Sequence, residues 1–325
     1  MLKRVAAITL GCAKNQVDTE YMLGMLPESD YVIVAKPEEA DAVVINTCCF
    51  IEEAKEEAIN TLLQLAGEKR RNPRLKVIAT GCLVQKYVRE LLTEIPEIDG
   101  LMGTGQVDGL VVALEHVFAG AKERYVSVLK DHLASRDFGE QRLVGAGPTS
   151  YLKIAEGCNN RCTYCVIPEI RGPYRSREIE ALVQEAEQLV AGGAREICLV
   201  AQDVTAYGLD LYGRLELPGL LKRLAGIDDL RWIRLFYCYP THITRELIKV
   251  VKEEEKICKY FDIPFQHADD GLIKRMGRKG NRELLERIIN ELRFFLPGVA
   301  LRTTFIVGFP GETEEEFQNL LDFIE

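Results

Sequence analysis

The chain has 325 residues, of which 47% are hydrophobic and 28% charged, values typical of a soluble protein with room for two domains. Its net charge of −9 excludes a broadly basic surface for nucleic acid, and its apolar runs are too short to cross a bilayer. The chain has ten cysteines, most of them in motifs instead of spread through a small secreted domain, so we predict reduced thiols in a cytoplasmic protein.

Residues 1–118 alternate short β-branched runs with helical patterns. We expect strands at 4–10, 31–35, 42–46 and 75–80, and helices at 17–26, 51–65, 85–94 and 107–118. Runs that are apolar on both faces and separated by helices indicate a parallel sheet covered on both sides. The sequence therefore predicts an α/β fold whose first domain is an open parallel sheet.

Residues 119–149 form a predicted connector, rich in Gly, Pro and polar residues toward its end. A second alternating series then fills 150–325, with strands expected at 151–155, 196–201, 232–237, 260–264 and 301–307. Helices fit 179–191, 243–254, 282–295 and the segment after Thr313, where Thr313 and Glu316 are spaced as a capping box. Five successive βα units predict a partial (β/α) barrel, truncated within its last helix.

Three cysteines follow predicted strands of the first domain. Cys12 comes after the first strand, Cys48 after the third and Cys82 after the fourth. Parallel strands bring their carboxyl ends to one edge, which is where open α/β sheets bind ligands. We expect these thiols to share one site; the alternative is three unrelated buried cysteines.

Cys158, Cys162 and Cys165 form a C-x-x-x-C-x-x-C loop directly after the first strand of the second domain. A cubane iron–sulfur cluster normally takes four thiolates, so three leave one iron open to a ligand. A structural zinc site prefers paired C-x-x-C units or added histidines, and neither lies nearby. The spacing thus favours a cluster with an open iron.

The other predicted barrel strands end in polar or glycine-rich turns, which is where barrel enzymes place their sites. Gln202 and Gln266 follow two of these strands, and Gly308 begins the turn Gly308-Phe-Pro-Gly-Glu312. We therefore expect these three residues to contact a cofactor.

The cysteine loop resembles that of the radical S-adenosylmethionine (SAM) superfamily. In that superfamily the open iron chelates SAM, and an electron from the cluster cleaves the sulfonium to give a deoxyadenosyl radical. By this resemblance Tyr164 matches the aromatic residue near the adenine, and Gly308 matches a turn near the nucleoside.

Three further motifs resemble those of the radical SAM methylthiotransferases: Gly11-Cys-Ala-Lys-Asn15, Asn46-Thr-Cys48 and Gly81-Cys82. The resemblance covers essentially the whole chain. It implies two [4Fe–4S] clusters, with Cys12, Cys48 and Cys82 as ligands of one and Cys158, Cys162 and Cys165 of the other. It further implies two SAM molecules, one a methyl donor and one a radical source, and an electron donor such as flavodoxin or ferredoxin.

The form of the first motif is similar to the branch that modifies a ribosomal protein. That branch inserts a methylthio group at the β-carbon of an aspartate in a small-subunit protein. Family members also carry a C-terminal β-barrel domain, which we expect to be absent here. The alternatives are a methylthiotransferase acting on tRNA adenosine, a radical enzyme of another type whose second cluster is auxiliary and, from another class, a non-catalytic iron–sulfur protein for electron transfer or sensing.

No residue is identified as a general acid or base, since clusters and SAM would carry the chemistry. Arg171, Arg175 and Arg177 are interpreted either as a solvated surface run or as a dock for an acidic target or phosphate. Arg302 and His267 are interpreted as structural. So are four cysteines outside the motifs: Cys49, Cys198, Cys238 and Cys258.

Overall fold

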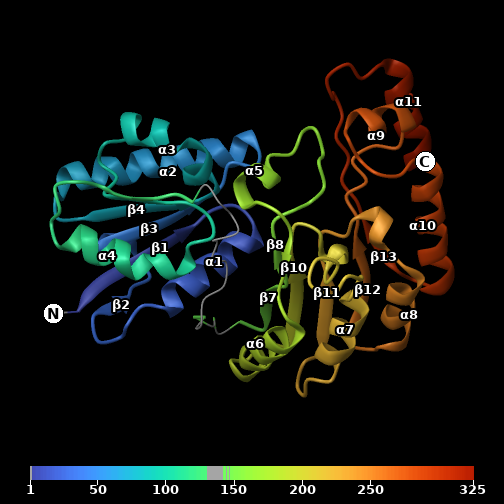
Figure 1. Ribbon diagram of the computed structural model, residues 1–325, viewed down its shortest axis with the longest axis horizontal. Helices are drawn as coiled ribbons and strands as arrows, with labels where there is room; N and C mark the ends of the chain where they lie inside the picture. Colours follow the sequence, from blue (N-terminus) through green and yellow to red (C-terminus); the bar gives the residue numbers. More distant parts are fainter. Residues whose placement is uncertain (1, 130–141, 144, 146) are drawn as a thin grey trace. The chain divides into compact units, whose positions relative to one another are not determined.

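The computed structural model describes residues 2–129, 142–143, 145 and 147–325. Contacts divide the chain into two compact units (Figure 1). The first comprises Met1–Val144 with Glu169–Pro173, and the second comprises Gly145–Pro168 with Tyr174–Glu325. Part of the predicted connector, residues 130–141, 144 and 146, lies outside the described residues.

The first unit is built on a parallel sheet of six strands in the order β2-β1-β3-β4-β5-β6. The strands are β1 (Lys3–Thr9), β2 (Tyr31–Ile33), β3 (Ala42–Thr47), β4 (Lys76–Gly81), β5 (Gly100–Met102) and β6 (Tyr125–Ser127). All six residues of β3 are buried, as expected for a central strand covered on both faces. The predicted open parallel sheet is confirmed.

Helices cover both faces of this sheet. They are α1 (Ala13–Gly24), α2 (Glu52–Arg71), α3 (Cys82–Glu94) and α4 (Leu110–Phe118). Figure 1 shows α2 and α3 on one face and α1 and α4 on the other. Each helix buries one stripe; in α2 this stripe is Ala58, Leu62, Leu65 and Ala66.

The second unit contains five parallel strands that follow one another across the sheet in chain order. They are β7 (Thr149–Lys153), β10 (Glu196–Val200), β11 (Trp232–Leu235), β12 (Ile257–Asp262) and β13 (Ala300–Arg302). A short antiparallel pair, β8 (Ala155–Glu156) and β9 (Arg175–Ser176), flanks the cysteine loop. The predicted series of five βα units is confirmed.

Helices connect these strands. The main ones are α6 (Ile179–Ala191), α7 (Leu217–Ala225), α8 (Arg245–Glu253), α10 (Arg282–Phe295) and α11 (Glu314–Ile324), with the shorter α5 (Ile167–Arg171) and α9 (Asp270–Arg275). The predicted capping box is present: the Thr313 hydroxyl accepts from the Glu316 N–H, and the Glu316 carboxylate accepts from the Thr313 N–H. This box fixes the start of α11 directly after the Gly308–Glu312 turn.

Candidate functional site

Three adjacent strands of the first unit place Cys12, Cys48 and Cys82 at one edge of the sheet. Strand β1 ends three residues before Cys12, and β3 and β4 end directly before Cys48 and Cys82. Because β1, β3 and β4 are neighbours, their carboxyl ends lie side by side. Cys48 and Cys82 are each 6% exposed, and Cys12 is partly exposed. The expected convergence at one edge is therefore confirmed.

Glycines let these cysteine turns approach one another. Gly11 has a φ of 90°, and a Cβ atom there would lie 2.5 Å from Cys48 Cβ and 2.9 Å from Cys48 Sγ. Gly81 has a φ of 95°, and a Cβ would collide with the Asn46 side chain and the Thr47 backbone. Only glycine combines a left-handed backbone with so close an approach.

Polar residues of the motifs hold the turns together. The Asn15 amide donates to the carbonyls of Leu10 (2.9 Å) and Thr47 (3.1 Å), joining the first turn to the second. Asn46 donates back to the Asn15 carbonyl at 2.9 Å, and Thr47 Oγ1 donates to the Thr80 carbonyl at 2.5 Å. All three side chains are buried, so these hydrogen bonds fix the positions of the cysteines.

The three thiols have different acidities. Burial raises the pKa of Cys82 to about 11, although the neighbouring Arg171 opposes this, and the charges of Cys12 and Cys48 raise it further. Burial likewise raises the pKa of Cys48. For Cys12 the effect of burial is outweighed by the Lys14 and Arg171 charges, so its pKa is lowered. Cys12 is the thiol of this group most readily present as thiolate, the form that binds iron.

Arg171 lies beside these cysteines, and its position contradicts both interpretations made from the sequence. The residue is 3% exposed, so it is neither solvated nor available to dock a substrate. Its Nη1 donates to Asp18 Oδ2 at 3.1 Å, and its Nη2 donates to Asn15 Oδ1 at 2.6 Å. Nη2 also lies 3.5 Å from Cys82 Sγ. Arg177 is paired as well, with Glu185 at 2.5 Å, and Arg175 lies in β9.

The second cysteine group lies in the loop between β8 and α5. The Asn160 N–H donates to Cys158 Sγ at 3.4 Å, and the Cys165 N–H donates to the Cys162 carbonyl at 3.0 Å. Burial raises the pKa of Cys158 to about 11 and also raises that of Cys165; the neighbouring loop thiols add to both shifts. The loop thus presents three partly exposed thiols close to one another.

Tyr164 is held in this loop by Arg278. The guanidinium donates to the Tyr164 hydroxyl at 3.1 Å and to the Pro264 carbonyl at 2.8 Å, and it lies 3.9 Å from Cys162 Sγ. Burial raises the pKa of Tyr164, so its phenol is neutral. Arg278 was not predicted from the sequence, because it follows α9 and is 116 residues from Cys162 in the chain.

Glu156 and Gln202 lie together at the ends of their strands. Gln202 Nε2 donates to Glu156 Oε1 at 2.5 Å, and the other Glu156 oxygen accepts from Lys153 at 2.9 Å. Lys153 is fully buried and Glu156 is 1% exposed. The Gln202 Oε1 atom is buried without a hydrogen-bond partner among the described residues. A buried unpaired amide oxygen suits a ligand that brings a donor, such as an amino group.

Asp203 anchors a second polar group that sequence reasoning missed. Its Oδ1 accepts from the N–H groups of Thr205 and Ala206, and its Oδ2 lies 3.1 Å from His242 Nδ1. Oδ2 also accepts from Asn160 at 3.3 Å, which ties the cysteine loop to β10. The signal available in the sequence was its position one residue after Gln202.

The remaining predicted cofactor residues lie after β12 and β13. Gln266 has a φ of 72° and exchanges backbone hydrogen bonds with Thr304 and Ile306. Gly308 has a φ of 73°, with open space where a Cβ would lie. His267 is fully buried between the Asp269 N–H and Glu312, which confirms its structural interpretation.

Several other residues are placed outside these groups. Arg302 pairs with the buried Asp262 at 3.5 Å but is itself exposed. Cys198 and Cys238 are buried in the core as predicted, whereas Cys258 is partly exposed. Cys49 is buried beside Cys48, and burial raises its pKa to about 12.

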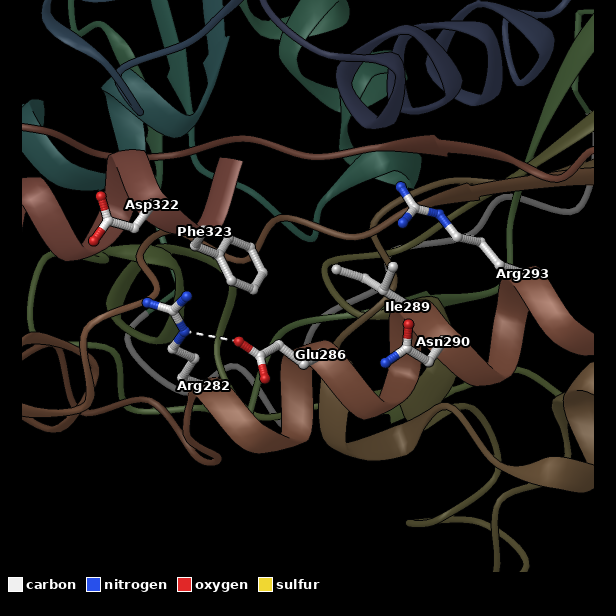
Figure 2. A pocket seen from close by; sticks show the side chains of 7 residues that line it. All are labelled: Arg282, Glu286, Ile289, Asn290, Arg293, Asp322 and Phe323. Carbon is white, nitrogen blue, oxygen red and sulfur yellow. Dashed lines mark hydrogen bonds and ion pairs between the residues drawn. The ribbon is translucent and has the colours of Figure 1, made fainter. Parts of the chain in front are cut away.

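A depression of about 220 Å³ lies between α10 and α11 (Figure 2). Its lining includes the ion pair of Arg282 with Glu286 at 2.7 Å, together with Arg293, Asp322 and Phe323. No residue of this lining belongs to the predicted cluster or cofactor residues.

The donor sets suit iron–sulfur clusters. Each group offers three thiols, and a cubane bonds each thiolate to a different iron, so its ligands surround a volume. Among the described residues, no group of three Cys, His, Asp or Glu side chains forms a site for a single metal ion. The same part of the chain contains no helix with the length and hydropathy of a membrane span.

Comparisons with known proteins agree with these observations. Residues 152–324 match the radical SAM superfamily, and residues 4–103 match the uncharacterized protein family UPF0004. Solved structures with this fold include the cobalamin-dependent radical SAM enzyme OxsB (TM-score 0.71, 13% identity, covering 100% of this chain and 52% of OxsB). They also include the methyltransferase TsrM from Kitasatospora setae (TM-score 0.70, 15% identity, 99% of this chain and 71% of TsrM).

Curated relatives are much more similar. The ribosomal protein uS12 methylthiotransferases RimO of Pelotomaculum thermopropionicum and Moorella thermoacetica are 48% and 51% identical over 322 residues. The alignments cover 99% of this chain and 72% and 73% of those proteins. The chain therefore belongs to the RimO family of radical SAM methylthiotransferases, enzymes that transfer a sulfur-containing group with the help of iron–sulfur and SAM cofactors.

Proposed function

We propose that this enzyme binds two [4Fe–4S] clusters and two SAM molecules, and inserts a methylthio group at the β-carbon of an aspartate in ribosomal protein uS12. Residues 1–118 would hold one cluster on Cys12, Cys48 and Cys82, and residues 150–325 would hold the other on Cys158, Cys162 and Cys165. Of the expected connector 119–149, residues Tyr125–Ser127 belong to the first sheet as β6. The arrangement of the first three cysteines at the ends of β1, β3 and β4 is the observation that carries this proposal.

When bound, the clusters would relay an electron from the external donor, and SAM would supply the radical and the methyl group. The chain's own residues bind and orient these groups. The buried ion pair of Lys153 with Glu156 lies at the barrel strand ends, and the unpaired Gln202 oxygen offers an acceptor to a ligand amine. The Arg278 contact fixes the Tyr164 ring beside the cysteine loop, where it can contact an aromatic base.

The substrate follows from the relatives named above, which modify uS12. A ribosomal substrate agrees with the acidic chain, whose charge of −9 would repel tRNA phosphates. It also implies a cytoplasmic enzyme that receives electrons from a carrier such as flavodoxin or ferredoxin. Anaerobic turnover with isolated uS12 should add one CH₂S unit to the protein, detected by mass spectrometry, and unmodified tRNA should show no such gain.

Iron and acid-labile sulfide after anaerobic reconstitution test the two clusters. The wild-type chain should hold about eight irons, and the Cys158/Cys162/Cys165→Ala variant about four. A matched Cys198/Cys238/Cys258→Ala variant removes three thiols outside the motifs and should retain about eight. A wild-type value of about four that falls to none would mean that Cys12, Cys48 and Cys82 bind no cluster, which contradicts the proposal.

A further inference from the structure

Arg171 is a cation buried in the first unit next to the proposed ligand Cys82. The guanidinium is 3% exposed, and its Nη2 lies 3.5 Å from Cys82 Sγ, which is within hydrogen-bond distance for sulfur. A buried charge is costly unless it is paired, so this arginine has a specific set of partners. Its position in the fold is therefore defined closely.

Two of those partners hold the guanidinium from the side of α1. Nη1 donates to Asp18 Oδ2 at 3.1 Å, while Nη2 donates to Asn15 Oδ1 at 2.6 Å. Asn15 in turn joins the turns that carry Cys12 and Cys48. The planar fork of arginine can make these contacts simultaneously, whereas the single ammonium of lysine cannot.

A single contact between Arg171 and a cysteine ligand is enough to change the reduction potential of a cluster. Hydrogen bonds and positive charge at cluster sulfurs stabilise the more negative, reduced state and so raise the reduction potential.

The segment that carries Arg171 belongs to the first unit, although it lies within the sequence of the second. Residues Glu169–Pro173 belong to the first unit, although the flanking residues belong to the second. The Thr104 hydroxyl donates to the Ile170 carbonyl at 2.7 Å, which anchors this segment beside the end of β5. Only three residues separate Glu169 from Cys165, the last cysteine of the second group. The short segment that follows that cysteine loop therefore supplies the cation.

We infer that Arg171 is a positioning residue for the cluster proposed on Cys12, Cys48 and Cys82, called here the auxiliary cluster. It orients Cys82 through a charge-assisted N–H···S contact and raises the reduction potential of that cluster. The inference rests on the proposed function, since it requires a cluster on Cys12, Cys48 and Cys82. It adds to that function a residue outside all three N-terminal motifs.

Redox titration of the auxiliary cluster alone tests the inference. The background is the full chain with Cys158/Cys162/Cys165→Ala, reconstituted anaerobically, and the readout is the midpoint potential followed by electron paramagnetic resonance. Arg171→Gln should make reduction at least tenfold less favourable, which for one electron corresponds to a potential about 59 mV lower. Arg171→Lys keeps the charge but not the fork, so its shift should have the same sign and be smaller.

Arg142→Gln provides the matched control. Arg142 is a second buried arginine of the first unit, with 3% of its side chain exposed, and it pairs with Glu20. Its removal changes the charge equally and should leave the potential as in the background. Equal shifts for Arg142→Gln and Arg171→Gln would overturn the inference, because they would show a general effect of charge.

Each remaining outcome also decides the matter. Midpoint potentials unchanged from the background protein in both Arg171 variants would overturn the inference. If Arg171→Gln does not fold, Arg171→Lys decides alone: a lowered potential supports the inference and an unchanged one overturns it. A background protein that binds no iron would instead refute the proposed function, so the two failures are distinguishable.

Discussion

The smallest side chains determine how closely the first three cysteines can approach. Gly11 and Gly81 precede Cys12 and Cys82, and both have left-handed φ angles with neighbouring atoms where a Cβ would lie. The motif asparagines and threonine then lock the turns by hydrogen bonds to backbone. Packing between the turns thus explains why a glycine precedes Cys12 and Cys82.

Substitution of Gly11 by alanine should therefore damage this site. The left-handed backbone alone costs about 1–2 kcal/mol for a residue with a Cβ. The overlap with Cys48 adds about 1–3 kcal/mol of overpacking. Gly120→Ala is the matched control in the same unit, since Gly120 has a φ of 71° and open space around it. Urea unfolding of the metal-free protein should show the larger loss for Gly11→Ala, with reduced iron uptake in that variant only; equal losses would contradict this account.

The sequence was sufficient to predict residues whose place in the fold follows from their position after a strand. It placed each cysteine after its strand because parallel strands order their ends, a rule that needs no knowledge of distant partners. It failed for Arg171, whose partner Asp18 lies 153 residues away. A run of arginines looks the same whether it is solvated or buried, so only the tertiary structure reveals the pairing. Cluster ligation by the six cysteines remains a prediction.

At the scale of elements, the capping box of α11 also supports the turn predicted to contact SAM. Arg275 of α9 donates to both carboxylate oxygens of Glu316 at 2.7 Å and to the Gly311 carbonyl at 3.3 Å. The same Glu316 carboxylate accepts from the Thr313 backbone. One ion pair thus holds the helix start and the Gly308–Glu312 turn together.

This arrangement predicts an unusual titration for Glu316. The hydrogen bond from Arg275 lowers its pKa from 4.5 to about 2, with help from Thr313. A depressed pKa stabilises the folded state above the unfolded pKa, so this contribution is complete above about pH 5 and declines as the pH falls toward 2. Carboxyl ¹³C NMR should show Glu316 still ionised at pH 4, and Arg275→Gln should return its pKa toward 4.5. Lys274→Gln, which removes the neighbouring charge, should leave it low; an ordinary Glu316 pKa in the wild-type chain would refute the prediction.

Elements that carry no motif were predicted unevenly, for physical reasons. The pattern of 179–191 and 282–295 matched α6 and α10 because each buries a clear stripe at helical spacing. Strand β5 was missed because three residues beginning with Gly100 give no periodic signal. Helix α7 was missed as well; its first turn contains Pro218, which is favourable at a helix start yet easily taken for a loop.

At the scale of the whole molecule, each cysteine group belongs to one compact unit with its own sheet. Cys12, Cys48 and Cys82 lie in the first unit, and Cys158, Cys162 and Cys165 in the second. The described hydrogen bonds to each group's sulfur atoms come from within its own unit, for example from Arg171 in the first and Arg278 in the second. Each site is therefore expected to load its cluster independently of the other.

Independence of the sites predicts how SAM binding responds to cysteine substitution. Cys12/Cys48/Cys82→Ala should bind SAM with the affinity of the wild-type chain, because Cys158, Gln202 and Gly308 are untouched. Cys158/Cys162/Cys165→Ala should bind at least tenfold more weakly, a loss of about 1.4 kcal/mol, since SAM would lose its iron ligand. Anaerobic equilibrium dialysis of the reconstituted proteins measures both. A matching loss in the two variants would show that the sites depend on each other, because a cluster in one unit would then be required to form the SAM site in the other.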